Sequence, residues 1–366
     1  MAQLGQQALS SHPSHDGKLH KRSFFGGLAQ SALGHSLSQG QNQPYSQHAL
    51  SNTQSQHPGN DPLAGMHLPP ATRALLHYAQ EKGILDDLAR YFKVIPPHPN
   101  FCYSRCTGRK KAVCIGINYV GQRDELKGCA NDARNMRDFL IKNYGFKDQD
   151  ILLLIDDSHG RGSPRPTRKE MFHAMGWLVS NAQPHDSLFF HYSGHGGQSP
   201  DASGKEVDGM DEVIFPVDYN ENSRRDDGPA DIIDDELHEA LVHDLPAGVR
   251  LTAVFDSCHS GTVLDLPYLH SAHGRLRSMG HVSKRAKERG GADAGDVICF
   301  AACRDDEKSA DTREGGVPVG AMSYAFIQAL ERNRNQTYEE LLQHLRATLI
   351  PKYHQKAQIS GTHPVV

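Results

Sequence analysis

The sequence has no long hydrophobic run. No stretch of its 366 residues approaches the ~18 apolar residues that a membrane-spanning helix needs, and no early apolar segment resembles a signal peptide. These absences predict a protein that does not insert into membranes. The expected compartment is the cytoplasm, with the nucleus as an alternative.

Excess charge and paired cysteines are also missing. The net charge is -4 at pH 7, so no global basic field predicts binding to nucleic acid or to anionic membranes. The seven cysteines are scattered and odd in number, which favours reduced intracellular thiols over a disulfide framework. Cys102 and Cys106 form a C-x3-C pair without a second pair of ligands, so a structural zinc site is not expected.

Apolar periodicity is almost absent from the start of the chain. From Met1 to about Pro62 the sequence consists mainly of Gln, Ser, His and Gly, a composition that cannot bury enough surface to offset its ordering entropy. Helical spacing of apolar residues appears between 70 and 92, and a proline-rich linker follows at 96–99. We therefore assign 1–106 to a low-complexity, largely disordered arm with one or two short helices.

From about residue 107 onward, continuous apolar strands alternate with amphipathic helices. This alternation predicts an α/β fold with a mostly parallel central sheet and helices on both faces. The expected strands are 112–117, 151–155, 188–192, 251–255 and 297–301, and the expected helices are 131–144, 167–178, 234–245, 323–330 and 337–349.

Two of the expected strands end in reactive side chains. The strand at 251–255 leads into Asp256, Cys258 and His259, and the strand at 188–192 leads to His195 between glycines. A Cys and a His at two strand ends suit nucleophilic acyl transfer, with Cys258 as nucleophile and His195 as base. His259 is a rival base, but successive strand residues face opposite ways, so it should point away from Cys258. Asp256 should face the same side as Cys258, which indicates a pocket for a cationic group.

Five motifs in order resemble those of a type I metacaspase. The resemblance runs from about Cys106 to the C-terminus, and the Gln-rich arm resembles the pro-region of fungal-type members. It implies a caspase-like three-layer sandwich with a large catalytic part at 107–269, a basic linker at 270–295 and a small part at 296–366. The motifs are Gly128-Cys129-Ala130-Asn131-Asp132-Ala133, Tyr192-Ser193-Gly194-His195-Gly196, Asp211-Glu212-Val213-Ile214-Phe215-Pro216-Val217-Asp218, Asp256-Ser257-Cys258-His259-Ser260-Gly261 and Gly320-Ala321-Met322-Ser323-Tyr324-Ala325-Phe326.

The resemblance also assigns roles around the dyad. It implies an oxyanion hole made of the backbone N–H groups of Gly196 and Cys258. It places Asp132 in one S1 pocket with Asp256, lined by Cys129 and Ser193. Two neighbouring carboxylates repel unless a cation lies between them, and Arg can bind them in a forked geometry, so cleavage after Arg or Lys is expected. The alternative role for Asp132 is to cap its own helix.

A third acidic group predicts bound calcium. The resemblance implies four ligands, and carboxylates without His or Cys partners suit a hard, oxygen-binding ion. The alternative is that Asp234 caps a helix and the others are solvated, while Asp208, Asp218 and Asp231 leave the ligand set open by a residue or two. The implied ligands are Asp211, Asp234, Asp235 and Asp265.

The basic linker is the expected site of self-cleavage. Exposed flexible loops are where proteolysis concentrates, and this one carries the residues that the S1 pocket would accept. The alternative is a solvated basic loop without such a role. The candidate cleavage residues are Arg275, Arg277, Lys284, Arg285, Lys287 and Arg289.

These features predict a calcium-dependent cysteine endopeptidase that cleaves after Arg or Lys through an acyl-enzyme. The resemblance implies a monomer with protein and peptide substrates, acting in programmed cell death, stress response or protein quality control. One alternative is a relative of the legumain or gingipain kind. Another is a stress scaffold that binds protein aggregates through the Gln-rich arm and has only secondary peptidase activity.

Overall fold

The computed structural model describes residues 100–157, 162–201, 204, 209–219, 230–258, 260–270, 276–277, 293–302, 311–314 and 317–363. All of them belong to one of the two compact units into which the chain divides. Most of the predicted arm, including the helices expected at 70–92, lies outside the described residues.

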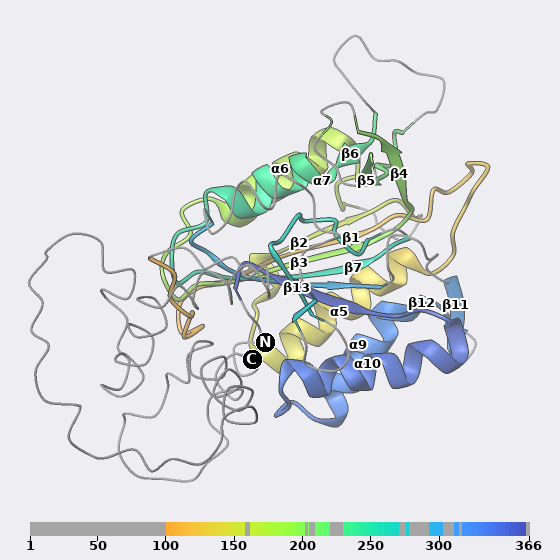
Figure 1. The fold of residues 1–366 in the computed structure, drawn as a ribbon. Helices are drawn as coiled ribbons and strands as arrows, with labels where there is room; N and C mark the ends of the chain where they lie inside the picture. The colour runs from red at the N-terminus through yellow and green to blue at the C-terminus, as the bar shows by residue number, and fades with distance from the viewer. Residues whose placement is uncertain are drawn as a thin grey trace, which may run out of the picture. The chain divides into compact units, whose positions relative to one another are not determined.

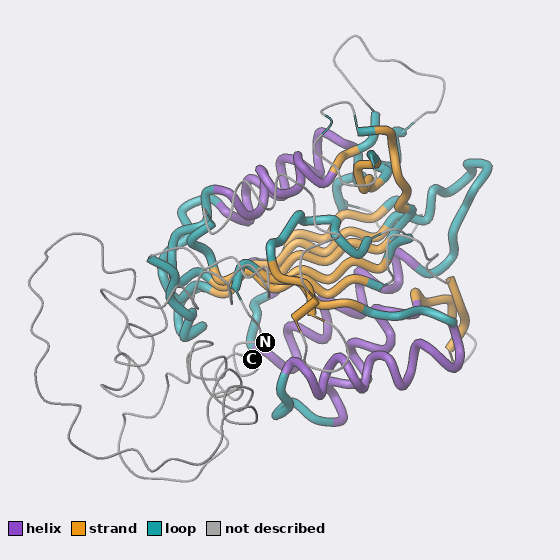
Figure 2. Tube along the Cα trace, in the orientation of Figure 1, coloured by secondary structure: helices purple, strands orange, loops and turns teal. Residues whose placement is uncertain are grey.

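An eight-stranded sheet forms the centre of this unit (Figures 1 and 2). Its strand order is β2-β1-β3-β7-β10-β13-β8-β9. The first five strands in that order are parallel, and the remaining three each pair antiparallel with the strand before. The prediction of a mostly parallel sheet is therefore confirmed. The strands are β1 (Lys110–Gly116), β2 (Ile151–Ile155), β3 (Ser187–Ser193), β7 (Arg250–Asp256), β8 (Tyr268–His270), β9 (Leu276–Arg277), β10 (Asp296–Ala301) and β13 (Gln358–Gly361).

Helices cover both faces of the sheet, which confirms the three-layer sandwich (Figure 1). One face carries α6 (Arg168–Val179), α7 (Asp234–His238) and the π-helix η2 (Glu239–His243). The other face carries α5 (Cys129–Tyr144), α9 (Ala321–Arg332) and α10 (Tyr338–Tyr353). The single helix expected at 234–245 is thus an α-helical turn that continues as a π-helix.

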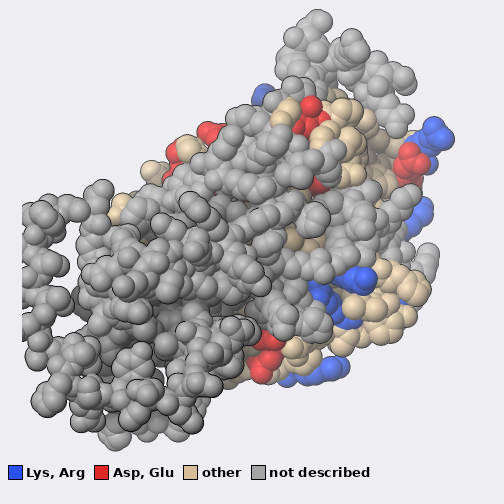
Figure 3. Space-filling view, viewed as in Figure 1, with Lys and Arg blue, Asp and Glu red and all other residues tan. Residues whose placement is uncertain are grey.

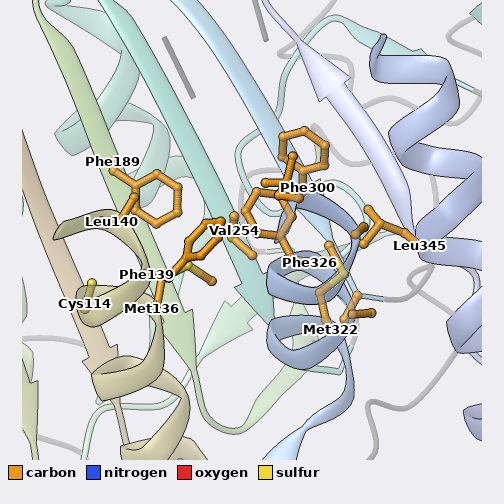
Figure 4. Packing of buried hydrophobic residues seen from close by; sticks show 14 of the residues in the cluster. Cys114, Met136, Phe139, Leu140, Phe189, Val254, Phe300, Met322, Phe326 and Leu345 are labelled. Atoms are coloured by element: carbon orange, nitrogen blue, oxygen red, sulfur yellow. The ribbon is translucent and has the colours of Figure 1, made fainter. Parts of the chain in front are cut away.

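The core explains why both faces need helices. Along β1, Ala112 and Cys114 belong to the cluster on the α5 side, whereas Val113 and Ile115 belong to the cluster on the α6 side, and all four are fully buried. This is the side-chain alternation of a strand that is covered on both sides. Figure 4 shows side chains of β1, β3, β7 and β10 facing those of α5, α9 and α10.

Two smaller sheets complete the described strands. One has the order β4-β5-β6 and consists of β4 (Gly196–Pro200), β5 (Met210–Ile214) and β6 (Ile232–Ile233). The other pairs β11 (Asp311–Glu314) with β12 (Val317–Gly320). A short 3-10 helix, η1 (Asp148–Asp150), precedes β2. Because β4 begins one residue after His195, the three-stranded sheet starts beside this predicted base, just beyond the carboxyl end of β3.

Two described parts of the segment at 270–295 belong to the main sheet, whereas 293–295 form a loop before β10. β8 ends at His270, and β9 pairs with it at Leu276–Arg277. On the face shown in Figure 3, the coloured charged side chains form small scattered groups of both signs. None of the helices in the described ranges has the length and apolar character needed to cross a bilayer.

Candidate active site

His195 and Cys258 lie at the carboxyl ends of two neighbouring parallel strands. Ser193 of β3 pairs with Asp256 of β7, and each catalytic candidate follows two residues later. The backbone N–H of Gly194 donates to the carbonyl of Asp256 at 3.4 Å. A Cβ on Gly196 would lie 2.2 Å from the Cys258 carbonyl oxygen, so only glycine allows this approach of the two loops. The structure therefore brings the predicted dyad and the predicted oxyanion residues together.

The hydrogen bonds of His195 fix its tautomer. Its Nε2 lies 2.6 Å from the carbonyl oxygen of Asp124. Because a carbonyl can only accept, Nε2 carries the proton, and Nδ1 of the neutral ring is left as an acceptor. Nδ1 is therefore the nitrogen that could take a proton from the Cys258 thiol, which is partly exposed.

Tyr119 holds His195 in place, a role that the sequence analysis missed. The two rings stack with centroids 4.6 Å apart. The Tyr119 hydroxyl accepts from the backbone N–H of His195 at 3.0 Å and donates to the carbonyl of Phe215 at 2.6 Å. The Tyr192 hydroxyl donates to the His195 carbonyl at 2.7 Å. Only the place of Tyr119 just beyond an apolar strand could have indicated such a role.

Asp132 and Asp256, two of the predicted S1 residues, converge on Gly320. Asp132 accepts hydrogen bonds from the Ser193 hydroxyl at 2.8 Å and from the Gly320 N–H at 2.8 Å. Asp256 accepts from the Ser323 N–H at 2.7 Å. A Cβ on Gly320 would lie 2.3 Å from an Asp256 oxygen and 2.7 Å from an Asp132 oxygen. Both carboxylates are buried, at 1% and 4% exposure.

The start of α9 stabilises these two negative charges. Gly320 is its N-cap, and both Gly320 and Ser323 direct backbone N–H groups at the carboxylates. The partial positive charge of a helix N-terminus offsets part of the repulsion between two buried anions. The alternative role for Asp132 does not apply, because its own helix has Gly128 as N-cap and no side-chain cap.

The other proposed S1 residue, Cys129, is also close to the site. Cys129 is buried at the start of α5. Burial raises the pKa of the Tyr192 hydroxyl, and the neighbouring thiols of Cys129 and Cys258 act in the same direction. Both thiols thus lie close to the hydroxyl that holds the His195 carbonyl.

Three of the four predicted calcium ligands form a cluster. Asp211, Asp234 and Asp235 each offer one oxygen, and these oxygens lie within 4.8 Å of one another. Calcium binds oxygens at about 2.3–2.6 Å, so ligands on opposite sides of one ion are about 5 Å apart. The donor type and the spacing therefore fit calcium. Asp234 is not the N-cap of α7, because Ile233 holds that position.

Asp265 is not part of that cluster. It is buried, with a φ of +47°, and its N–H donates to the Thr262 carbonyl at 2.6 Å. Of the neighbouring acids, Asp218 accepts from the Arg168 N–H at 2.9 Å and is not in the cluster either. Asp208 lies outside the described residues.

Comparison with known proteins identifies the family. Residues 110–267 match the family model "Metacaspase, peptidase C14 domain". Metacaspase-1 of Cryptococcus neoformans is 46% identical over 73% of this chain, and Metacaspase-1 of Pyricularia oryzae is 45% identical over 72% of it and 74% of its own length. The chain belongs to the metacaspase family. Metacaspase-1A of Aspergillus fumigatus, 44% identical over 74% of this chain, agrees.

The extent of these matches differs between relatives. The chain spans 65% and 66% of the length of two Cryptococcus metacaspases, which is less than two thirds. A crystal structure from Geobacter sulfurreducens is 23% identical, with a TM-score of 0.47, and covers 69% of this chain and 93% of its own. Metacaspases are caspase-like cysteine peptidases, so the family sets aside the legumain or gingipain alternative.

Some residues that the sequence analysis named in this metacaspase lie outside the described residues. The backbone of Arg277 pairs with Leu269 in the sheet, but its side chain is not described. The rival base His259 is not described. The same holds for the other cleavage candidates, Arg275, Lys284, Arg285, Lys287 and Arg289.

Proposed function

We propose that this chain is a cysteine endopeptidase. The observation that supports it is the position of His195 and Cys258 at adjacent strand ends, with His195 Nε2 held by the Asp124 carbonyl. His195 Nδ1 takes the thiol proton, and the Cys258 sulfur attacks the peptide carbonyl carbon. The backbone N–H groups of Gly196 and Cys258 bind the oxyanion. Protonated His195 then gives its proton to the leaving amine, and water hydrolyses the acyl-enzyme.

The substrate has Arg or Lys at the residue before the cut. Asp132 and Asp256 present two buried carboxylates at one point, and the α9 N-terminus balances only part of their charge. A guanidinium or ammonium group would complete that balance, and a guanidinium can bind both carboxylates at once. An Asp side chain would add a third negative charge to the pocket.

Calcium would be held by Asp211, Asp234 and Asp235, with Asp265 as a further ligand from the loop after Cys258. Its chemical contribution would be to neutralise the mutual repulsion of these carboxylates and so to hold β5, the start of α7 and the loop with Asp265 together. The enzyme would then cut itself in the linker at 270–295. Activity as a monomer in the cytoplasm or nucleus, and a role in cell death, stress response or protein quality control, belong to the same proposal.

The test is hydrolysis of two fluorogenic peptides that end in Arg and in Asp, each with calcium or with chelator. We expect cleavage of the Arg peptide only, only with calcium, and its loss in Cys258→Ala. Cys102→Ala, at an exposed thiol, is the matched control and should keep full activity.

The other outcomes separate the parts of the proposal. Cleavage of the Asp peptide would refute the carboxylate pocket, and activity that ignores chelator would refute the metal requirement. If folded protein cleaves neither peptide, the chain is not a peptidase of this kind, and binding of aggregates through the N-terminal arm becomes the leading function. A mass spectrum that shows an intact linker in fully active, calcium-loaded enzyme would refute self-cleavage.

A further inference from the structure

Glu212 lies between the acidic cluster and the catalytic edge, and the proposed mechanism gives it no role. It belongs to β5, is 3% exposed, and follows Asp211 directly. Successive side chains of a strand point to opposite faces, so Asp211 and Glu212 serve different sides of this small sheet.

One oxygen of the Glu212 carboxylate holds the strand that follows His195. Oε1 accepts from the side-chain amide of Gln198 at 3.2 Å. Gln198 lies opposite Glu212 in the pairing of β4 with β5, and β4 begins at Gly196. This contact therefore ties Glu212 to the chain three residues after the proposed base.

The other oxygen holds the loop that follows Cys258. Oε2 accepts from the Thr262 hydroxyl at 2.8 Å. The Thr262 carbonyl in turn accepts from the N–H of Asp265, so this loop is also connected to the fourth proposed calcium ligand. One buried carboxylate thus joins β4, which follows His195, to the loop that follows Cys258.

The backbone of the same residue contacts the acidic cluster. The Glu212 N–H donates to Asp234 at 3.2 Å, and Asp234 is one of the three clustered carboxylates. A shift of Asp234 toward a bound ion would move β5 at this residue, and the carboxylate would carry that movement to β4 and to the loop after Cys258.

We propose that Glu212 is a positioning residue that clamps β4, the strand after His195, to the loop after Cys258 and couples the acidic cluster to the dyad. This inference rests on the proposed function of the site. Glu212 acts through Gln198 and Thr262 and does not touch the substrate. A misplacement of reacting groups by about 1 Å can cost about 100-fold in rate, so a hydrogen-bonded clamp can control activity.

The experiment compares the full chain with Glu212→Gln, Thr262→Val and the double variant. Gln keeps the shape and one oxygen that can accept from Gln198, but its NH₂ group cannot accept from the Thr262 hydroxyl, so the Thr262 contact is lost or reversed in direction. Three quantities are measured: calcium affinity by calorimetry, the rate and pH profile of Cys258 alkylation by iodoacetamide with and without calcium, and kcat and KM for the Arg peptide. Glu239→Gln, at an exposed position in η2, is the matched control.

We expect Glu212→Gln to keep calcium affinity within about 3-fold and KM within about 3-fold, while kcat falls by about 10- to 100-fold. Calcium should no longer accelerate alkylation of Cys258, and the alkylation profile should move to higher pH. Thr262→Val should have the same kind of effect, and the double variant should be no worse than the stronger single one, because both substitutions act on the same Glu212–Thr262 contact.

Three results would overturn the proposal. These are an unchanged kcat and alkylation profile, strictly additive effects of the two substitutions, or a loss of calcium affinity above about 10-fold, which would make Glu212 part of the metal site. If Glu212→Gln does not fold, Thr262→Val alone carries the test, since it removes a single hydroxyl. If the wild-type chain does not cleave the Arg peptide, the proposed function fails, but the alkylation comparison still tests the clamp.

Discussion

Tyr119 shows how one side chain can fix the proposed base. It adopts a φ of +54°, a backbone conformation that costs a non-glycine residue about 1–2 kcal/mol. In return, its hydroxyl bridges the His195 N–H and the Phe215 carbonyl, and its ring lies on the His195 ring. The residue with this unfavourable backbone conformation is therefore also the residue whose contacts hold the His195 imidazole.

Replacing Tyr119 by Phe should lower the rate without abolishing binding. The ring contact stays, but the partly buried N–H of His195 loses its acceptor, at about 1–3 kcal/mol, while the Phe215 carbonyl keeps the Tyr192 hydroxyl at 3.3 Å. We expect kcat for the Arg peptide to fall by about 10-fold or more, with KM little changed. Steady-state kinetics between pH 5 and 9 would check this. Tyr353→Phe, at the end of α10, is the control.

His191 is a second buried residue whose surroundings determine the protonation of its side chain. It is fully buried on β3, its Nε2 lies 2.9 Å from the Ser323 hydroxyl, and its Nδ1 has no hydrogen-bond partner among the described residues. Burial lowers the pKa of its imidazole to about 3. The ring is therefore neutral in the folded protein under all ordinary conditions.

This lowered pKa should make the protein sensitive to acid. The unfolded chain binds a proton at His191 below about pH 6.5, whereas the folded chain does not until about pH 3. The free energy of unfolding should therefore fall as the pH decreases from 6.5, by up to about 1.4 kcal/mol per pH unit from this residue. In urea titrations at pH 7, 6 and 5, the free energy of unfolding of His191→Gln should decrease less with falling pH than that of the wild type. His173→Gln, at a largely exposed site, should keep the wild-type slope. Equal slopes in all three proteins would contradict this explanation.

At the scale of elements, the start of α9 organises the proposed specificity pocket. Its N-cap Gly320 has a φ of -77°, so glycine is needed there for space and not for a left-handed backbone. Both carboxylates occupy the space that a Cβ would take.

Gly320→Ala should therefore damage the pocket selectively. The added methyl group would push Asp132 and Asp256 apart, so we expect kcat/KM for the Arg peptide to fall by about 100-fold or more. Alkylation of Cys258 should be nearly unchanged, since the dyad lies on other elements. Gly176→Ala is the control: nothing lies within 4 Å of the new Cβ in the middle of α6, and stability should rise by about 0.5–1 kcal/mol. Equal effects of the two substitutions on hydrolysis would argue against the pocket.

The strands that the sequence predicts well are those that are covered by apolar side chains on both faces. The strand expected at 151–155 is β2 with the same bounds, and the strand expected at 251–255 is β7 with one residue added at each end. A strand that is buried on both faces reads as a continuous apolar run, which needs no knowledge of its neighbours. Capping signals also hold, because Thr337 and Glu340 bond each other's backbone at the start of α10.

The elements that the sequence analysis missed depend on partners far along the chain. β4, β5 and β13 are short and carry polar residues, so only their pairing in space makes them strands. The same distinction separates the site residues. Cys258, His195 and Asp256 follow apolar runs and could be selected from the sequence, whereas Gly320 and Tyr119 matter only because the fold places them against those side chains.

At the scale of the whole described unit, one buried carboxylate joins distant parts of the chain. Asp296 at the start of β10 lies opposite Arg250 at the start of β7, and their side chains pair at 2.7 Å. The same carboxylate accepts from the Ser104 N–H at 2.9 Å and lies 2.9 Å from His363 Nε2. Burial alone would raise the pKa of Asp296, but Arg250 and His363 bring it down to about 2. Its stabilising effect is thus complete above about pH 4 and is lost as the pH falls toward 2.

Asp296→Asn should destabilise the protein without changing its chemistry. Arg250 is 1% exposed and would keep its charge without a carboxylate, a loss that typically costs about 3–5 kcal/mol. Asp148→Asn removes an ion pair to Arg137 at an exposed carboxylate and should cost less than about 1 kcal/mol. Urea unfolding at pH 7 compares the two. Because Asp296 lies at the amino ends of the parallel strands and the dyad at their carboxyl ends, kcat of the folded Asp296→Asn enzyme should match that of the wild type. A cost no larger than that of Asp148→Asn would mean that the apolar core, and not this carboxylate, holds the two ends of the described chain together.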